Sequence, residues 1–192
     1  MCGIVGYIGN KNASQVLIEG LKKLEYRGYD SAGIAIIDGD DILVRKCKGA
    51  LKFLEQKIAD ETIKGSVGIG HTRWATHGEP SDTNSHPHAS MDGSISIVHN
   101  GIIENYARIK AQLQAQGSVF LSQTDTEVVV HLIDKIYKEE KDIFKAVLKV
   151  LHMVEGSYAL GVICKDYPDR VICCRKESPL VIGLGKDENF IA

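Results

Sequence analysis

Apolar residues along the chain follow two periods, and each period predicts one kind of element. Short runs of apolar or alternating residues predict strands, whereas apolar residues three or four positions apart predict amphipathic helices. The strand pattern covers residues 4–8, 34–37, 42–47, 67–71, 95–99, 158–164, 170–175 and 180–184. The helix pattern begins near residues 14, 51, 105, 125 and 142.

Capping residues mark the ends of several predicted helices. We expect Ser14 to cap the first helix, and Thr124 with Glu127 matches the spacing of a capping box at the start of the fourth. Asp142 is placed to cap the fifth helix, and Gly117 to end the third. These signals give the predicted helices defined boundaries.

Two stretches lack either period and are expected to be loops. Residues 26–31 contain Gly28, where a positive φ is expected. Residues 73–90 form a longer polar stretch, and long loops in compact domains often carry function. The Asp38-Gly39 pair between two predicted strands predicts the turn of a β-hairpin.

The order of the elements predicts the fold class. Antiparallel connections dominate, and the helices come in consecutive pairs rather than alternating singly with strands. This order favours an α+β fold of sheets packed between helices over a doubly wound parallel fold. No repeat or linker divides residues 1–192, so we expect one domain; the sequence stops directly after a strand pattern, so we expect it to be truncated at its C-terminus.

Composition excludes several classes of function. The formal net charge is −2 and acidic and basic residues are interleaved, which argues against a nucleic-acid or membrane surface. No apolar run approaches the roughly 20 residues of a membrane span, and no secretory signal is visible. The five cysteines are irregularly spaced, which argues against a disulfide framework and favours the cytoplasm.

The first candidate for chemistry is Cys2, directly after the initiator methionine. Removal of Met1 would leave a thiol and an α-amino group on one Cα. Their reference pKa values, about 8.5 and about 7.7–8.0, allow the amine to serve as the base for the thiol. A small residue at position two also favours methionine removal by itself, so position alone leaves both interpretations open.

Three further signals each have two interpretations. Asn100-Gly101 suits an oxyanion hole, but Asn-Gly is also a common turn. Arg73, next to the single tryptophan, suits a carboxylate ligand or a surface salt bridge. Asp125 suits a ligand ammonium or the first turn of a helix.

Histidines crowd one region, which raises the possibility of zinc. They are His71, His77, His86, His88 and His99. The His86-Pro87-His88 spacing is not a helical pair, and no adjacent acidic residue supplies a companion ligand, so no metal is expected.

Taken together, several segments resemble the class II glutamine amidotransferases. They are residues 2–6, 25–33, 71–80, 86–88, 99–105 and 124–127, and the similarity continues in order to Ala192. The resemblance implies a four-layer αββα N-terminal nucleophile hydrolase fold with mostly antiparallel sheets. Within the family it is strongest to members in which the ammonia converts fructose 6-phosphate to glucosamine 6-phosphate, a transferase reaction of hexosamine biosynthesis.

The resemblance also implies roles for individual residues. Cys2 would attack the side-chain amide of L-glutamine and form a γ-glutamyl thioester, and Asn100 and Gly101 would hold the oxyanion. Glutamine-binding positions would be Arg73, Trp74, Thr76, His77, Asp125, Arg27 and His86. Among these, Arg73 would bind the α-carboxylate and Asp125 the α-ammonium. No cofactor is implied.

The implied partners are L-glutamine and sugar-phosphate isomerase domains, absent from this sequence, that accept fructose 6-phosphate in a homodimeric full-length enzyme. Three alternatives remain at this point: the glutaminase domain of another class II member, a non-catalytic glutamine-binding module, and a metal hydrolase.

Overall fold

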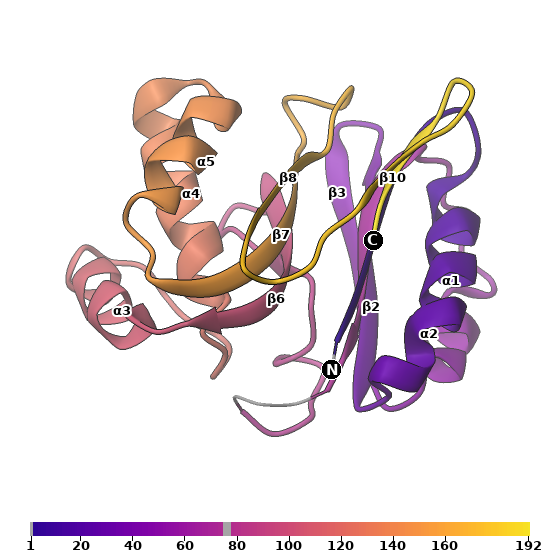
Figure 1. Cartoon of the computed structure of the whole chain (residues 1–192), viewed down its shortest axis with the longest axis horizontal. Coiled ribbons are helices and arrows are strands. Elements are labelled where there is room, and N and C mark those ends of the chain that lie inside the picture. The colour runs from indigo at the N-terminus through magenta and orange to yellow at the C-terminus, as the bar shows by residue number, and fades with distance from the viewer. Residues whose placement is uncertain (1, 75–77) are drawn as a thin grey trace.

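The protein is described by a computed structural model that covers residues 2–74 and 78–192. Two antiparallel sheets lie face to face, and helices cover the outer face of each sheet (Figure 1). The layers therefore follow the order helix, sheet, sheet, helix. This arrangement confirms the predicted α+β sandwich.

Within the residues that the structure describes, the first sheet has six strands and contains the first strand of the chain. Its order is β3 (Asp41–Lys48), β2 (Ser31–Asp38), β4 (Val67–Arg73), β1 (Gly3–Ile8), β10 (Asn189–Ile191) and β9 (Ile182–Leu184). The second sheet has four strands, in the order β5 (His88–Ala89), β6 (Ile95–Ile103), β7 (Gly156–Cys164) and β8 (Ile172–Lys176). Neighbouring strands pair antiparallel throughout.

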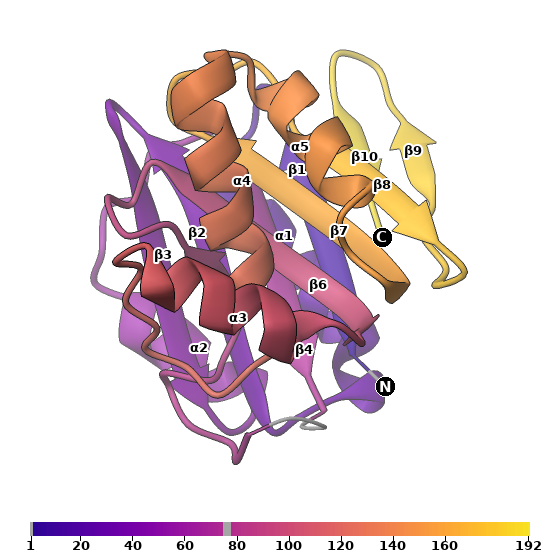
Figure 2. The ribbon, with the colours of Figure 1, turned by 90° about the vertical axis from the view of Figure 1, so that its left-hand side faces the viewer.

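The helices divide between the two sheets. The first sheet is covered by α1 (Ala13–Leu24) and α2 (Leu51–Ile58), with a short 3-10 turn η1 (Glu25–Arg27) after α1. The second is covered by α3 (Tyr106–Ala115), α4 (Glu127–Glu140) and α5 (Ile143–Leu151) (Figure 2). Among the described residues, no helix is long and apolar enough to cross a membrane.

Apolar side chains fill three layers. One lies under each helical layer, and the third lies between the sheets, where Ile69 of β4 packs in one cluster with Val98 of β6 and Ala159 of β7. Strands in such a position are buried on both faces, so they have nearly continuous apolar sequences rather than clean alternation. This is why β2 and β4 were recognisable as short apolar runs.

Some predicted boundaries are confirmed and others are wrong. Asp142 caps α5 by accepting a hydrogen bond from the Lys145 N–H, and Gly117 follows the end of α3 with a φ of +94°. The predicted cap of α1 is wrong: the cap is Asn12, whose side chain accepts from the backbone N–H groups of Ser14 and Gln15.

Gly28 does not adopt the positive φ that was expected. Its φ is −170°, which is extended backbone. Glycine is required there for a different reason: a Cβ on Gly28 would lie 2.8 Å from the carbonyl carbon of Arg73 and 2.9 Å from the nitrogen of Trp74. The 26–31 loop therefore packs directly on the backbone at the end of β4.

Three strands differ from the predicted pattern. β5 lies inside the stretch 73–90 that was predicted to be a loop. β6 continues through Asn100 and Gly101 to Ile103, so this Asn-Gly pair is not a turn. β10 was not predicted, because three residues are too few to show a period, yet it pairs with β1 inside the sheet.

The cap of α1 gives a direct test of the local structure. We expect Asn12→Ala to lower the free energy of unfolding by about 1 kcal/mol, because two N–H groups of the first turn lose their acceptor. Ser14→Ala is the matched control and should cost less, since the Ser14 hydroxyl only donates to the Asn12 side chain. Urea unfolding measures both, and a larger loss for Ser14→Ala would contradict this cap assignment.

Candidate active site

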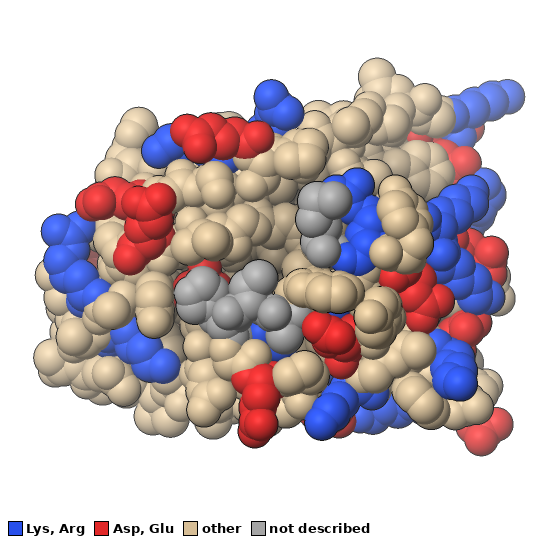
Figure 3. All heavy atoms as spheres, turned by 60° about the horizontal axis from the view of Figure 1, so that its bottom comes forward, with Lys and Arg blue, Asp and Glu red and all other residues tan. Residues whose placement is uncertain are grey.

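Cys2 lies at one end of the first sheet, immediately before β1. Antiparallel pairing places Gly3 opposite Thr72, so Cys2 lies beside the residues that end β4. Its Sγ accepts a hydrogen bond from the Trp74 N–H at 3.2 Å. Figure 3 shows this end of the molecule, where acidic and basic side chains are interleaved on the surface.

Asn100 reaches Cys2 from the second sheet. Its Nδ2 donates to the Cys2 carbonyl oxygen at 3.2 Å, and its Oδ1 lies 2.8 Å from Nε2 of His71. The next residue, Gly101, has a φ of +131°, and a Cβ there would overlap the Ser157 carbonyl oxygen of β7. Position 101 thus requires glycine, and its backbone lies next to the Asn100 amide.

Two side chains of opposite charge are buried beside Cys2. Arg73 is 3% exposed, and its Nη2 donates to the Gly78 carbonyl at 3.1 Å. Asp125 is 5% exposed, and its Oδ2 accepts from the Ile103 N–H at 2.8 Å. Burial lowers the pKa of Arg73, while the charges of Cys2, Asp30 and Asp125 oppose this shift.

These groups meet around one small cavity. It is lined by Cys2, Arg73, Trp74, His86, His99, Gly101, Thr124, Asp125 and Thr126. Burial raises the pKa of the Cys2 thiol, although the Trp74 N–H and the Arg73 charge act in the opposite direction. The cavity therefore combines a thiol, a fixed cation and a fixed anion, which are the groups needed to hold and attack a zwitterionic amino acid.

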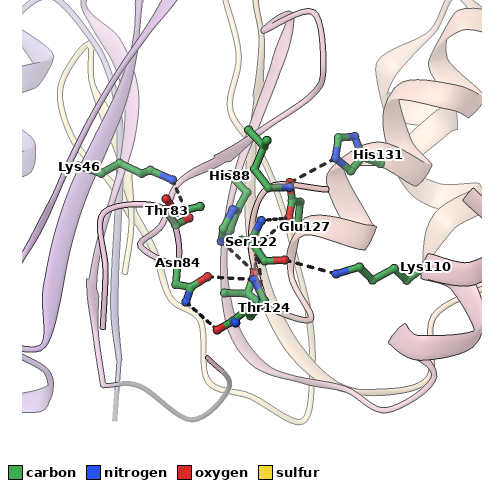
Figure 4. Close-up of polar contacts among 11 residues, drawn as sticks. Lys46, Thr83, Asn84, His88, Lys110, Ser122, Thr124, Glu127 and His131 are labelled. Atoms are coloured by element: carbon green, nitrogen blue, oxygen red, sulfur yellow. Dashed lines mark hydrogen bonds and ion pairs between the residues drawn. The ribbon is translucent and has the colours of Figure 1, made fainter. Parts of the chain in front are cut away.

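The loop that carries Asp125 is held by Glu127, the first residue of α4 (Figure 4). The buried Glu127 carboxylate accepts from the N–H groups of Leu121 and Ser122 at 2.8 and 2.7 Å. The predicted capping box is therefore wrong, because Glu127 reaches back to these residues and the Thr124 hydroxyl pairs with Nε2 of His88 at 3.0 Å. The carboxylate fixes the loop before α4 rather than its first turn.

Buried histidines surround the cavity. Thr126 Oγ1 lies 2.9 Å from Nε2 of His86 and 2.8 Å from Nδ1 of His99, so one hydroxyl joins both rings. Burial lowers the pKa values of His71 and His86, so both rings are neutral near pH 7. Within residues 2–74 and 78–192, no three His, Cys, Asp or Glu side chains are grouped so that they could hold a metal ion.

The structure places most of the predicted site residues together. Cys2, Arg73, Trp74, His86, Gly101 and Asp125 line the cavity, and Asn100 contacts Cys2. Trp74 is 44% exposed and packs edge-to-face on Tyr29, so it is not a core residue. Arg27 lies in η1 outside the cavity lining, and Thr76 and His77 fall outside the described residues.

Sequence reasoning missed four residues that belong to this site. His99, Thr124 and Thr126 line the cavity, and His71 contacts Asn100. The clustering of histidines was the available signal for His71 and His99. The two threonines were missed because Thr124 was interpreted only as part of a capping box and Thr126 was given no role.

The comparison with protein families identifies the class to which this fold and cavity belong. The model of the glutamine amidotransferase domain matches residues 55–175, more than half of the chain. The chain belongs to the glutamine amidotransferase domain family.

Relatives and solved structures agree with this membership. The chain is 60% identical over 192 residues to a protein of Clostridium tetani named glutamine--fructose-6-phosphate aminotransferase [isomerizing], and 58% identical to one of the same name from Caldanaerobacter subterraneus. These matches span all of this chain but 31% of each relative.

The fold matches as well. A glutamine phosphoribosylpyrophosphate amidotransferase from B. subtilis superposes with a TM-score of 0.85 at 29% identity, over 100% of this chain and 41% of that one. A class-II glutamine aminotransferase domain protein from Silicibacter pomeroyi, at 12% identity, has a TM-score of 0.66 over 100% of this chain and 87% of that one, and shows the fold alone. The fold is that of the N-terminal nucleophile amidotransferases.

The Glu127 carboxylate gives a prediction about pH. Burial opposes its charge, but the contact with His131 Nε2 at 3.5 Å and the hydrogen bonds from Leu121 and Ser122 outweigh burial and lower its pKa to about 2. A carboxyl whose pKa is lower in the folded than in the unfolded state stabilises the fold at any pH above the unfolded-state pKa. This stabilisation is lost as the pH falls toward 2. Glu127→Gln should therefore lower the free energy of unfolding by about 2 kcal/mol at pH 7.

The same difference should shrink as the pH falls toward 2, because a growing fraction of the wild-type carboxyl is then protonated and neutral. Thermal unfolding across this pH range measures the effect. Glu139→Gln, an exposed position on the same helix, is the control and should change little at any pH. Equal losses for the two variants at pH 7 would contradict the assigned role of Glu127.

Proposed function

We propose that this chain is a glutaminase domain that hydrolyses the side-chain amide of L-glutamine, with Cys2 as the nucleophile. One observation carries the proposal: Cys2, Arg73, Gly101 and Asp125 come from separate segments of the chain and line one cavity. The resemblance at the sequence level and membership of the amidotransferase family support the same reaction.

The reaction begins with removal of Met1, which frees the α-amino group of Cys2. This amine accepts the thiol proton, and Sγ attacks the amide carbon of glutamine. The Nδ2–H of Asn100 and the N–H of Gly101 stabilise the oxyanion. The carbon–nitrogen bond then breaks, the α-ammonium returns the proton to the leaving ammonia, and water hydrolyses the γ-glutamyl thioester to glutamate.

Substrate orientation follows from charge. Free glutamine carries an α-carboxylate and an α-ammonium, and the two buried charged side chains among the described lining residues are Arg73 and Asp125. Arg73 binds the carboxylate and Asp125 the ammonium, so the side chain points toward Sγ. Trp74 and His86 also line this cavity, and the resemblance assigns Thr76, His77 and Arg27 to glutamine binding as well.

Residues 1–192 form the glutaminase domain in this proposal, and further domains of the whole protein use the ammonia to convert fructose 6-phosphate to glucosamine 6-phosphate. The name shared by the 60% and 58% identical relatives supports fructose 6-phosphate as the acceptor. The phosphoribosylpyrophosphate amidotransferase is only 29% identical, so a phosphoribosyl acceptor has less support. We also propose that the whole protein is a homodimer and that it lies in the cytoplasm. The five free cysteines support the cytoplasm as its compartment.

Two substitutions separate binding from turnover. Arg73→Ala should raise KM for glutamine by roughly 30-fold or more, because the α-carboxylate loses a buried charged partner. Asn100→Ala should leave KM nearly unchanged and lower kcat by about 10²–10³-fold, the effect of losing one oxyanion donor. Steady-state release of ammonia and glutamate gives both constants.

The matched control for Arg73 is Arg170→Ala, an exposed arginine that pairs with the neighbouring Asp169. It should behave as wild type. The reverse kinetic pattern for Arg73 and Asn100 would contradict the assigned roles. Binding of glutamine without turnover, in a chain with verified removal of Met1, would favour a non-catalytic module.

A further inference from the structure

We infer that His71 is a positioning residue for the oxyanion hole: its Nε2–H holds the Asn100 carboxamide with the nitrogen toward Cys2. This inference rests on the proposed function, because it assigns a purpose to an orientation that matters only if Asn100 Nδ2 stabilises an oxyanion. The sequence did not indicate such a role, since His71 and Asn100 lie on different strands of different sheets.

The contact bridges the two sheets. His71 is fully buried on β4, where it pairs with Ile4 of β1 and Gly33 of β2. Its Nε2 lies 2.8 Å from Asn100 Oδ1 and 3.1 Å from the His99 carbonyl oxygen. Both partners belong to β6, so the ring fixes the end of the second sheet against the strand that ends beside Cys2.

The hydrogen-bond chemistry fixes the amide orientation. The Cys2 carbonyl oxygen only accepts, so the Asn100 atom that faces it at 3.2 Å must be the NH₂ nitrogen. The amide oxygen then faces His71. Because Nε2 of His71 meets two acceptors, it must carry the ring proton, and Nδ1, which is buried without a hydrogen-bond partner, stays unprotonated.

The proton stays on Nε2 over the range in which an amidotransferase works. Burial lowers the pKa of His71 to about 3, and the charges of His99 and Arg73 act in the same direction. The hydrogen bonds to the Asn100 side chain and to the His99 backbone oppose this shift but are outweighed. The His86 ring, 4.3 Å away between centroids, is also neutral at pH 7 because it is buried. A neutral ring offers one donor in a constant direction.

This donor matters because an unrestrained carboxamide has two orientations. A rotation of half a turn would put Oδ1 beside the Cys2 carbonyl and toward the substrate oxygen, so an oxyanion would meet an acceptor instead of a donor. Two acceptors at hydrogen-bond distance without a proton repel each other. The His71 N–H also disfavours the rotated state, because the Asn100 NH₂ group would then face the Nε2–H of His71, and two donors cannot form a hydrogen bond.

His71 acts through Asn100 rather than on the substrate. It is not among the residues that line the cavity, and the proton on Nε2 is directed at two protein oxygens. A general base would need a free ring nitrogen in the cavity. The expected signature is therefore a loss of turnover that depends on the presence of Asn100.

The test compares His71→Phe, His71→Leu and His71→Gln in the full chain. Phe keeps a ring and Leu keeps a similar volume, but neither can donate, whereas Gln restores an N–H. Without the donor we expect kcat for glutamine hydrolysis to fall about 10–100-fold, less than the loss of Asn100 itself, with KM within about threefold of wild type. Gln should recover most of the lost turnover.

Two further readouts separate positioning from a general structural role. Alkylation of Cys2 by iodoacetamide is a direct displacement that needs no oxyanion hole, so its rate should stay within about twofold of wild type. In a double-mutant cycle, adding His71→Leu to Asn100→Ala should cause little further loss of kcat, because the two residues act as one unit.

The control is His152→Phe, an exposed histidine at the C-terminal end of α5 that is not among the residues lining the cavity. It should leave the kcat of the wild type unchanged. Additive losses in the cycle, or an unchanged kcat in folded His71→Leu, would overturn the positioning role alone. If His71→Phe does not fold, His71→Leu and His71→Gln decide the matter, and a His71→Gln that is as slow as Leu would also overturn it. A wild-type chain with free Cys2 that does not hydrolyse glutamine would instead overturn the proposed function.

Discussion

The pairing of β1 with β4 is the constraint on which the rest of the site depends. β1 lies inside the six-stranded sheet between β4 and β10, so its backbone is held on both edges by antiparallel hydrogen bonds. A residue next to a chain terminus is ordinarily poorly ordered. Here the terminus continues into a central strand, so Cys2 has a defined position opposite the end of β4.

The second sheet completes this position across the sandwich. Asn100 donates to the Cys2 carbonyl, and His71 returns a contact from β4 to the Asn100 amide. Asp125 is held by the N–H of Ile103, which lies on β6 together with Asn100, and Glu127 fixes the loop around Asp125. The site is thus built on strand ends and one tethered loop, a rigid support for groups that must be preorganised.

Sequence patterns predicted the fold class and most elements because strands buried on both faces and helices with one apolar face leave different periods. The hairpin of β2 and β3 and the end of α3 at Gly117 were recognisable from local turn chemistry. β10 was not, since its existence depends on pairing with β1 rather than on its own residues. Asn12 and Glu127 were misassigned because several polar residues near each helix start could satisfy the same N–H groups.

The candidate site divides in the same way. Cys2, Asn100-Gly101 and Arg73 stand out locally because their residue types suit nucleophilic attack, an oxyanion hole and a carboxylate ligand, but each also has an ordinary structural use. Which of two interpretations applies depends on contacts between sheets, and the burial of Arg73 and Asp125 around one cavity became visible only in the structure. His71 could not be assigned from sequence, since its role depends on which atom of Asn100 it meets.

The central claim is that Cys2, freed by removal of Met1, is the nucleophile of a glutamine pocket. Intact mass before and after exposure to the glutamine-like electrophile 6-diazo-5-oxo-norleucine, followed by peptide mapping, tests it most directly. We expect a chain that has lost Met1 and gains a single adduct, located on Cys2 although four other cysteines are present. A correctly processed chain that gains no adduct, or gains one at another residue, would contradict it.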